Sequence, residues 1–426
     1  MTEDFLHYIW RQKKFKPLQL STIEGEPLVI HRFGYQNHDA GPDFSDARVQ
    51  IGDQLWVGNI EIHVRSSDWN RHAHQDDRAY NNVILHVVYE HDSEVQNARG
   101  IILPTLSLQG RFDESLYWRY ERLLNNQSPI PCQRHLPTID PFIVEKMLET
   151  VSIERLSSKA GIISGLMSQN QNDWNATFYH WLCRGFGLKI NEGPMEVLAR
   201  HLSWVVVHKH QQRIDQLEAL FFGTAGMLEE PKDDYSRALA REYRFLSHKY
   251  NLKSMEPSVW KFARLRPAAF PSLRMAQLAA LICKHANLFS QIIQTGTIEQ
   301  MYNLLSVEVT DYWNHHYRLG SFTEQKIGEI GTQFRDILVI NVIIPFLFVY
   351  GLFKDEPFYK QRAIDLLDQM KAENNKVVRM YKELGFPIKS ALDSQAVAQL
   401  SKHYCKPKKC LNCAIGTDIL KKKDDQ

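Results

Sequence analysis

The chain has 426 residues, enough for two or three domains, and its composition of 44% hydrophobic and 23% charged residues excludes a mainly disordered protein. A formal net charge of +2 excludes an overall basic field that would draw the chain onto nucleic acid or anionic lipid. Six cysteines are too few for a disulfide framework, and the first residues lack the basic and apolar regions of a secretory signal, so we expect a cytoplasmic protein.

The first 110 residues predict an α/β domain. Residues 2–4 are polar and begin a short helix that reaches about Lys14. Gly, Asn, Asp and Pro residues then separate short runs of β-type sequence. These runs cover residues 28–31, 47–51, 55–57, 60–64, 83–89 and 101–103. The order of helix, three strands, polar connector and two strands predicts a mixed sheet with a flanking helix.

The remainder of the chain predicts helices. Apolar side chains recur at helical spacing from residue 111 to about residue 400. Residues 337–353 are uncharged, but they contain Pro345 and are few for a membrane span, so they predict a buried, proline-kinked helix and no membrane association. The expected fold class is therefore α+β, with an α/β domain at residues 1–110, a helical domain at 111–400 and a cysteine-rich segment at 401–420.

Two carboxylates and a histidine form the strongest candidate for a catalytic site. Asp43 stands in a Gly-Pro-Asp-Phe turn. Glu61 and His63 are two positions apart in a predicted strand, so both point to one face of the sheet, which Asp43 can approach. Two carboxylates with room for water suit Mg²⁺ or Mn²⁺. Such a cation activates water and offsets the charge of a phosphoryl group.

This arrangement resembles the PD-(D/E)xK nuclease superfamily, whose fold is a helix, three strands, a helix and a strand. The resemblance implies a restriction-endonuclease-like α/β domain in which Asp43 and Glu61 are the metal ligands. His63 occupies the position of the lysine in that family, and a neutral imidazole is expected to act as the base or to orient the attacking water. Glu3, on the preceding helix, matches an additional glutamate of some members.

A histidine-rich connector offers an alternative. His72, His74 and Asp77, with His86 on the next predicted strand, resemble the HxHxD pattern of metallo-β-lactamase-type hydrolases, in which two zinc ions activate a hydroxide. Asp77 stands where that family has a histidine. The segment therefore predicts a zinc-dependent hydrolase. Alternatively, its side chains surround the Asp43 and Glu61 ligands and orient them. The third possibility is an ordinary polar connector.

A cluster of arginines lies farther along the chain. Arg264, Arg266 and Arg274 are interleaved with Phe and Pro close to the start of a predicted helix. Arginines in such a position can bind phosphate groups. They also commonly pair with acidic side chains of a neighbouring domain, so both interpretations stay open.

Three cysteines near the C-terminus predict a second metal site. Cys405, Cys410 and Cys413 lie close together, and a Cys-x₂-Cys pair presents two thiolates to one metal. His403 can supply the fourth ligand, and so can Cys132 from a predicted loop. Zinc is favoured because His403 is within reach. An iron–sulfur cluster is the alternative, since some PD-(D/E)xK nucleases hold such a cluster through one remote and three C-terminal cysteines.

Five segments together resemble an uncharacterised bacterial family, domain of unknown function 2851, over essentially the whole chain. They cover residues 41–44, 56–69, 72–92, 264–279 and 404–416. The resemblance implies a cytoplasmic bacterial protein and supplies no activity. Two functions therefore follow from the candidate site alone. The first is a metal-dependent phosphodiesterase or nuclease acting on nucleic acid, and the second is a non-catalytic scaffold with a nuclease-like fold that binds nucleic acid or protein.

Overall fold

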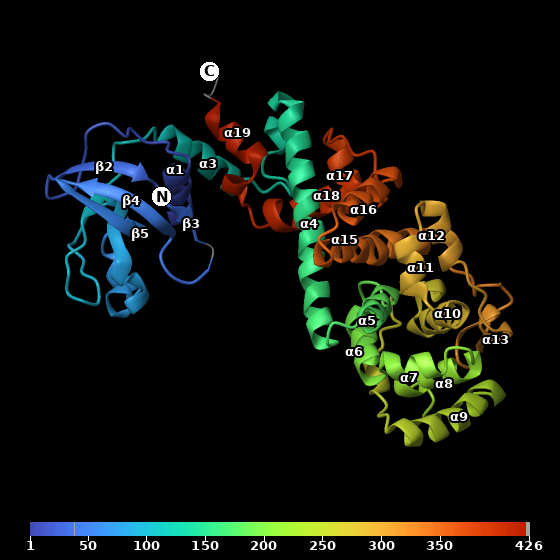
Figure 1. Ribbon diagram of the computed structural model, residues 1–426. Coiled ribbons are helices and arrows are strands. Elements are labelled where there is room, and N and C mark those ends of the chain that lie inside the picture. Colours follow the sequence, from blue (N-terminus) through green and yellow to red (C-terminus); the bar gives the residue numbers. More distant parts are fainter. Residues whose placement is uncertain (38, 423–426) are drawn as a thin grey trace. The chain divides into compact units, whose positions relative to one another are not determined.

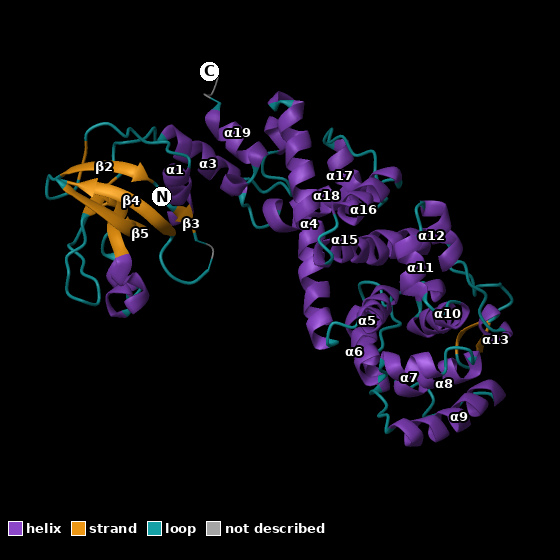
Figure 2. Ribbon diagram, in the orientation of Figure 1, coloured by secondary structure: helices purple, strands orange, loops and turns teal. Residues whose placement is uncertain are grey.

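The chain forms two compact units in a computed structural model that describes residues 1–37 and 39–422. Unit 1 comprises Met1–Met147 and the C-terminal residues from Leu400 onward, and unit 2 comprises Leu148–Gln399. Figure 1 labels the elements of both units. Unit 1 holds a mixed sheet and unit 2 is mainly helical, so the fold class is α+β, as predicted (Figure 2).

The sheet of unit 1 contains an antiparallel and a parallel part. Its strand order is β1-β2-β4-β5-β6-β7, and β3 pairs with β4 beside this path. β2, β4 and β5 are antiparallel neighbours, whereas β6 is parallel to β5 and β7 is parallel to β6. The strands are β1 (Leu20–Ser21), β2 (Pro27–Arg32), β3 (Tyr35–Gln36), β4 (Phe44–Ile51), β5 (Gln54–Arg65), β6 (Val83–Glu90) and β7 (Thr105–Ser107).

Two strands differ from their predicted bounds. The runs at residues 55–57 and 60–64 form one continuous strand, β5. The run at residues 101–103 is not a strand, since Ile102 makes only an isolated bridge. The physical reason is Pro104, which has no N–H to donate to a sheet. Its carbonyl accepts the N–H of His86 at 2.9 Å, so regular pairing with β6 begins one residue later, in β7.

Helix α1 (Glu3–Arg11) packs against β5. Its apolar residues Phe5, Ile9 and Trp10 are completely buried. The helix ends before the expected Lys14 because Lys13 has a left-handed backbone with φ of 52°, a conformation that terminates helices.

The first unit extends beyond the boundary predicted at residue 110, and it includes the cysteine-rich segment. Helix α3 (Ser115–Asn125) belongs to the same core as α1, because the Phe5 ring lies 5.2 Å from that of Tyr117 and 5.6 Å from that of Tyr120. The C-terminal helix α19 (Ala414–Lys421) packs against α3. Tertiary packing of this kind leaves no mark in the local sequence pattern.

Unit 2 contains a large hydrophobic core that includes the apolar run at residues 337–353. This run continues from α14 (Thr332–Leu338) through a π-helical turn at 339–343 into α15 (Ile344–Phe353). The helix 332–353 is long and apolar enough to span a membrane, but 67% of its most apolar window is buried, as in the core helix of a soluble protein. The π-helical turn arises because Pro345 has no N–H group to donate to the carbonyl oxygen four residues earlier.

The remaining elements of unit 2 are helices and one hairpin, and α4 crosses the boundary between the units. They are α4 (Pro141–Gln169), α5 (Trp174–Phe186), α6 (Glu192–His201), α7 (Trp204–Lys209), α8 (Ile214–Thr224), α9 (Asp234–Tyr250), α10 (Pro271–Lys284), α11 (Leu288–Gln294), α12 (Ile298–Leu305), α13 (Asp311–Asn314), β8 (His316–Arg318), β9 (Ser321–Phe322), α16 (Pro357–Gln369), α17 (Lys376–Glu383) and α18 (Ala391–Leu400).

Gly58 allows β5 and β6 to approach closely where their pairing begins. A Cβ atom at this position would lie 2.5 Å from the carbonyl oxygen of Asn82 and 2.5 Å from Cγ2 of Ile84. Because a backbone oxygen cannot move without moving its strand, Gly58→Ala should lower the free energy of unfolding by about 1–3 kcal/mol. Urea denaturation measures this change.

Gly161→Ala, in α4, is the matched control for this prediction. An added Cβ would meet no atom of the described residues within 4 Å. Alanine should therefore raise the free energy of unfolding by about 0.5–1 kcal/mol, because it lowers the entropy of the unfolded chain. Effects of the same sign in both variants would contradict the close strand approach at Gly58.

Candidate metal centre

The two carboxylates expected to converge do so in unit 1. Asp43 immediately precedes β4, and Glu61 lies on the neighbouring β5. The Asp43 N–H donates to Glu61 Oε2 at 3.0 Å, and the Ile62 N–H donates to Asp43 Oδ2 at 2.9 Å. These two bonds hold both side chains on the backbone of the adjacent strand. Burial raises the pKa of the Glu61 carboxyl group, because charge is costly in a dry interior.

His63 lies on the same face of β5 as Glu61, as the two-residue spacing predicted, and its Nε2 is 3.7 Å from Glu61 Oε1. The other ring nitrogen, Nδ1, is hydrogen-bonded at 2.9 Å to Nε2 of His86 on β6. Burial lowers the pKa of His63 to about 2 and that of His86 to about 3. Both rings are therefore neutral near pH 7, and a single proton lies between the two facing nitrogens.

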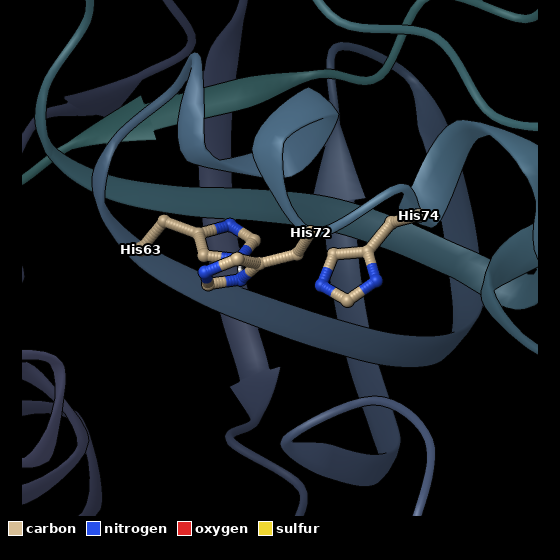
Figure 3. A group of neighbouring side chains, drawn as sticks. All are labelled: His63, His72 and His74. Carbon is tan, nitrogen blue, oxygen red and sulfur yellow. Dashed lines mark hydrogen bonds between the residues drawn. The ribbon is translucent and has the colours of Figure 1, made fainter.

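The connector between β5 and β6 brings two further histidines to this place. His72 follows the short helix α2 (Asp68–Arg71), and its Nδ1 is 3.2 Å from His63 Nε2. His74 Nε2 is 3.3 Å from Glu61 Oε1. Nitrogen atoms of His63, His72 and His74 all lie within 4.8 Å of one another, and Figure 3 shows the three rings gathered together. This is a spacing at which three imidazoles can bind one cation.

Aromatic packing holds the connector over the sheet. The ring of His74 stacks on Tyr80 with centroids 3.8 Å apart, and the buried Trp69 contacts His74 edge-on at 5.3 Å. Trp69 Nε1 donates to the carbonyl oxygen of Gln96 at 2.9 Å. Asp77, which the sequence pattern grouped with these histidines, is exposed and instead caps the following 3₁₀ turn by accepting the N–H of Ala79 at 2.8 Å.

Helix α1 adds His7, a residue that the motifs did not indicate. His7 Nε2 lies 3.1 Å from Asp43 Oδ2. Burial opposes protonation of this imidazole, but its hydrogen bond to Asp43 and the charges of nearby carboxylates outweigh burial and raise its pKa. Glu3, one turn earlier, lies within electrostatic range of His7, Asp43 and His72, and burial raises its pKa. The four-residue spacing of Glu3 and His7 on one helix was the signal available in the sequence.

The three arginines expected to bind phosphate or pair between domains lie in unit 2. Arg264 and Arg266 are exposed. Arg274 is buried, its guanidinium lies 3.4 Å from the ring centroid of Phe334, and its Nη1 donates to Gln277 Oε1 at 2.7 Å. These contacts make Arg274 part of the packing of unit 2, away from the surface where phosphate could bind.

The cysteines expected to bind metal lie in unit 1. Cys405, Cys410 and Cys413 are buried, whereas His403 is exposed. Cys132 is also buried in unit 1, and the three C-terminal thiols act electrostatically on it.

Comparison with known proteins gives one match. A family model described as "Protein of unknown function (DUF2851)" matches residues 3–376. This range contains every residue of the candidate metal centre, and it ends before the C-terminal cysteines. No curated protein and no solved structure matches the chain.

Proposed function

Because the chain belongs to the DUF2851 family, whose description assigns no activity, we propose from the metal centre itself that the protein is a metal-dependent hydrolase of phosphodiester bonds in nucleic acid. The observation that carries this proposal is the convergence of three histidines beside two linked carboxylates in unit 1. Three imidazoles beside two carboxylates at this spacing are suited to holding a divalent cation.

The donor set favours a cation that accepts both nitrogen and oxygen. His63, His72, His74 and Glu61 Oε1 would hold it, with Asp43 as the adjacent carboxylate. Imidazole suits zinc and other transition metals, whereas carboxylate and water suit Mg²⁺ and Mn²⁺. Three nitrogen donors therefore make Mn²⁺ a better fit than Mg²⁺, with Zn²⁺ as the competitor. This donor set combines the carboxylates of one sequence motif with two histidines of the other.

The surroundings of His63 suit it to bind a cation through Nε2. His63 can bind a cation through Nε2 only when its proton is on Nδ1, and the hydrogen bond between Nδ1 and His86 Nε2 accommodates that tautomer with His86 as the acceptor. Both rings are neutral, so neither needs to lose a proton before a cation binds. A bound divalent cation would lower the pKa of a water molecule and offset the charge of the phosphoryl group.

We assign His63 the role of ligand instead of base. With a pKa of about 2, its imidazole is too weakly basic to take a proton from water near pH 7. His7 is better suited to proton transfer, because its pKa is raised and it contacts Asp43 at 3.1 Å. When it is protonated, His7 would supply the positive charge that a lysine provides in the PD-(D/E)xK motif.

The choice of nucleic acid rests on the order of elements along the chain. Helix α1 is followed by the antiparallel strands β2, β4 and β5, a connector with short helices, and β6 parallel to β5. Asp43 precedes the second of these strands, and Glu61 lies on the third. The PD-(D/E)xK resemblance implies the same order of helix, three strands, helix and strand. This agreement supports a phosphodiester over other hydrolysable substrates.

Cleavage assays on single- and double-stranded DNA and RNA, each with Mn²⁺, Zn²⁺ or Mg²⁺, test the proposal. We expect cleavage that depends on Mn²⁺ and stops on chelation. Asp43→Asn should lower the rate about 100-fold or more, because the amide no longer holds His7 as its charged partner and removes one carboxylate from the centre. Asp53→Asn is the matched control, since it removes the same charge from the exposed turn between β4 and β5.

The outcomes separate the two functional classes. Equal rates in Asp43→Asn and the wild type would contradict this active site. Cation binding without cleavage of any of the four substrates would overturn the hydrolase and favour the non-catalytic, nuclease-like scaffold.

A further inference from the structure

Unit 1 contains a second cluster of metal-ligating side chains, which the proposed hydrolase does not use. We propose that Cys132, Cys405, Cys410 and Cys413 together bind a thiophilic metal centre through four thiolates, with Cys132 instead of His403 as the fourth ligand. The shared chemistry is tetrahedral sulfur coordination, which zinc and iron–sulfur clusters both accept.

Burial distinguishes the four thiols from His403. The exposed fractions of Cys132, Cys405, Cys410 and Cys413 are 8%, 9%, 7% and 7%, whereas His403 is exposed. The thiols of Cys405, Cys410 and Cys413 all lie within electrostatic range of Cys132. One buried cysteine is an ordinary small apolar residue, but four buried cysteines from two distant segments of the same unit can supply a complete ligand set.

Specific contacts bring the two segments together. Asn126 Nδ2 donates to the carbonyl oxygen of Pro131 at 2.8 Å and fixes the loop that carries Cys132. Lys408 Nζ donates to the carbonyl oxygen of Leu124, so the C-terminal segment is tied to the helix that precedes this loop. These bonds tie the loop that carries Cys132 and the C-terminal segment to the same helix, α3, without any help from a metal.

The C-terminal segment is shaped to hold a thiolate. Cys413 is the N-cap of α19, at the helix end where the first backbone N–H groups have no partner within the helix. A helix N-terminus favours a negatively charged group, such as a coordinating thiolate. Gly416 packs directly on Cys410, since a Cβ atom there would lie 2.2 Å from the Cys410 carbonyl oxygen. Only glycine permits this close approach of the two turns.

The surrounding charge complements a tetrathiolate. Four thiolates around a divalent cation carry a net charge of about −2. Four lysines stand between residues 402 and 409, within the same segment. Arg11 of α1 adds a fifth cation, donating to the carbonyl oxygen of Leu411 at 3.0 Å and to Asn412 Oδ1 at 3.1 Å. The metal centre would therefore also brace α1, the helix that carries Glu3 and His7.

Metal analysis of the full chain tests this proposal independently of any hydrolase activity. Protein purified anaerobically without chelator should contain about one zinc per chain, or iron with the visible absorption of a cluster. Cys132→Ser should lose most of this metal. His403→Ala and Cys283→Ser are the matched controls and should retain it, because His403 is exposed and Cys283 lies in α10 of unit 2.

A second measurement keeps the proposal falsifiable if Cys132→Ser does not fold. In the wild type, chelation should make Cys132, Cys405, Cys410 and Cys413 reactive to alkylation, as mapped by mass spectrometry, and should lower the thermal midpoint. Wild-type protein without stoichiometric metal would overturn the proposal, as would alkylation that chelation does not change. Loss of metal in His403→Ala with retention in Cys132→Ser would overturn the assignment of Cys132.

Discussion

Replacing Glu61 by glutamine should weaken Mn²⁺ binding by at least about 100-fold, because the change removes a charged ligand atom from the centre. The same variant should be as stable as the wild type without metal, or more stable. Burial raises the pKa of Glu61, so the folded protein disfavours its charged form, and an amide of the same shape avoids that cost. Calorimetric titration with Mn²⁺ and thermal denaturation in chelator measure the two effects.

Two further variants complete this experiment. Glu90→Gln is the control, because it removes one carboxylate from the exposed end of β6 and should leave Mn²⁺ affinity unchanged. His63→Ala distinguishes a ligand from a base: a ligand loses Mn²⁺ affinity, whereas a base loses only cleavage. Wild-type affinity in both Glu61→Gln and His63→Ala would show that the cation binds elsewhere.

Local sequence pattern predicted the part of the metal centre that depends on strand geometry. Side chains two residues apart in a strand share a face, so Glu61 and His63 had to lie together. Asp43 followed from its turn before the adjacent strand. The position of His72 and His74 could not be derived in this way, because it depends on how the connector packs, with Tyr80 stacked on His74 and Trp69 edge-on to both rings.

Two features could not be predicted because they depend on contacts between distant segments: the place of His7 in the metal centre, and the fourth ligand of the cysteines. His7 lies on the first helix, and only the fold brings it within 3.1 Å of Asp43 Oδ2. The choice between His403 and Cys132 depends likewise on the bond from Lys408 to the carbonyl oxygen of Leu124. Each of these residues was chemically suitable, but spacing along the chain carries no information about a neighbour so far away.

The buried histidine pair should make the metal-free protein sensitive to acid. The pKa is about 2 for His63 and about 3 for His86, against about 6.5 for an unfolded histidine. Between these values the unfolded chain binds protons that the folded chain does not, so this contribution is complete above pH 6.5 and is lost as the pH falls. At pH 5 the loss is about 2 kcal/mol for each group. Glu61 and His7, whose pKa values are raised, act in the opposite direction.

A variant at one position isolates this effect. His86→Gln keeps an amide oxygen that can accept from His63 Nδ1 but cannot titrate, so its loss of stability between pH 7 and pH 5 should be about 2 kcal/mol smaller than that of the wild type. Urea denaturation in chelator measures the difference, and His31→Gln on the exposed strand β2 should not change it. An identical pH dependence in wild type and His86→Gln would mean that the folded protein protonates His86 at no cost.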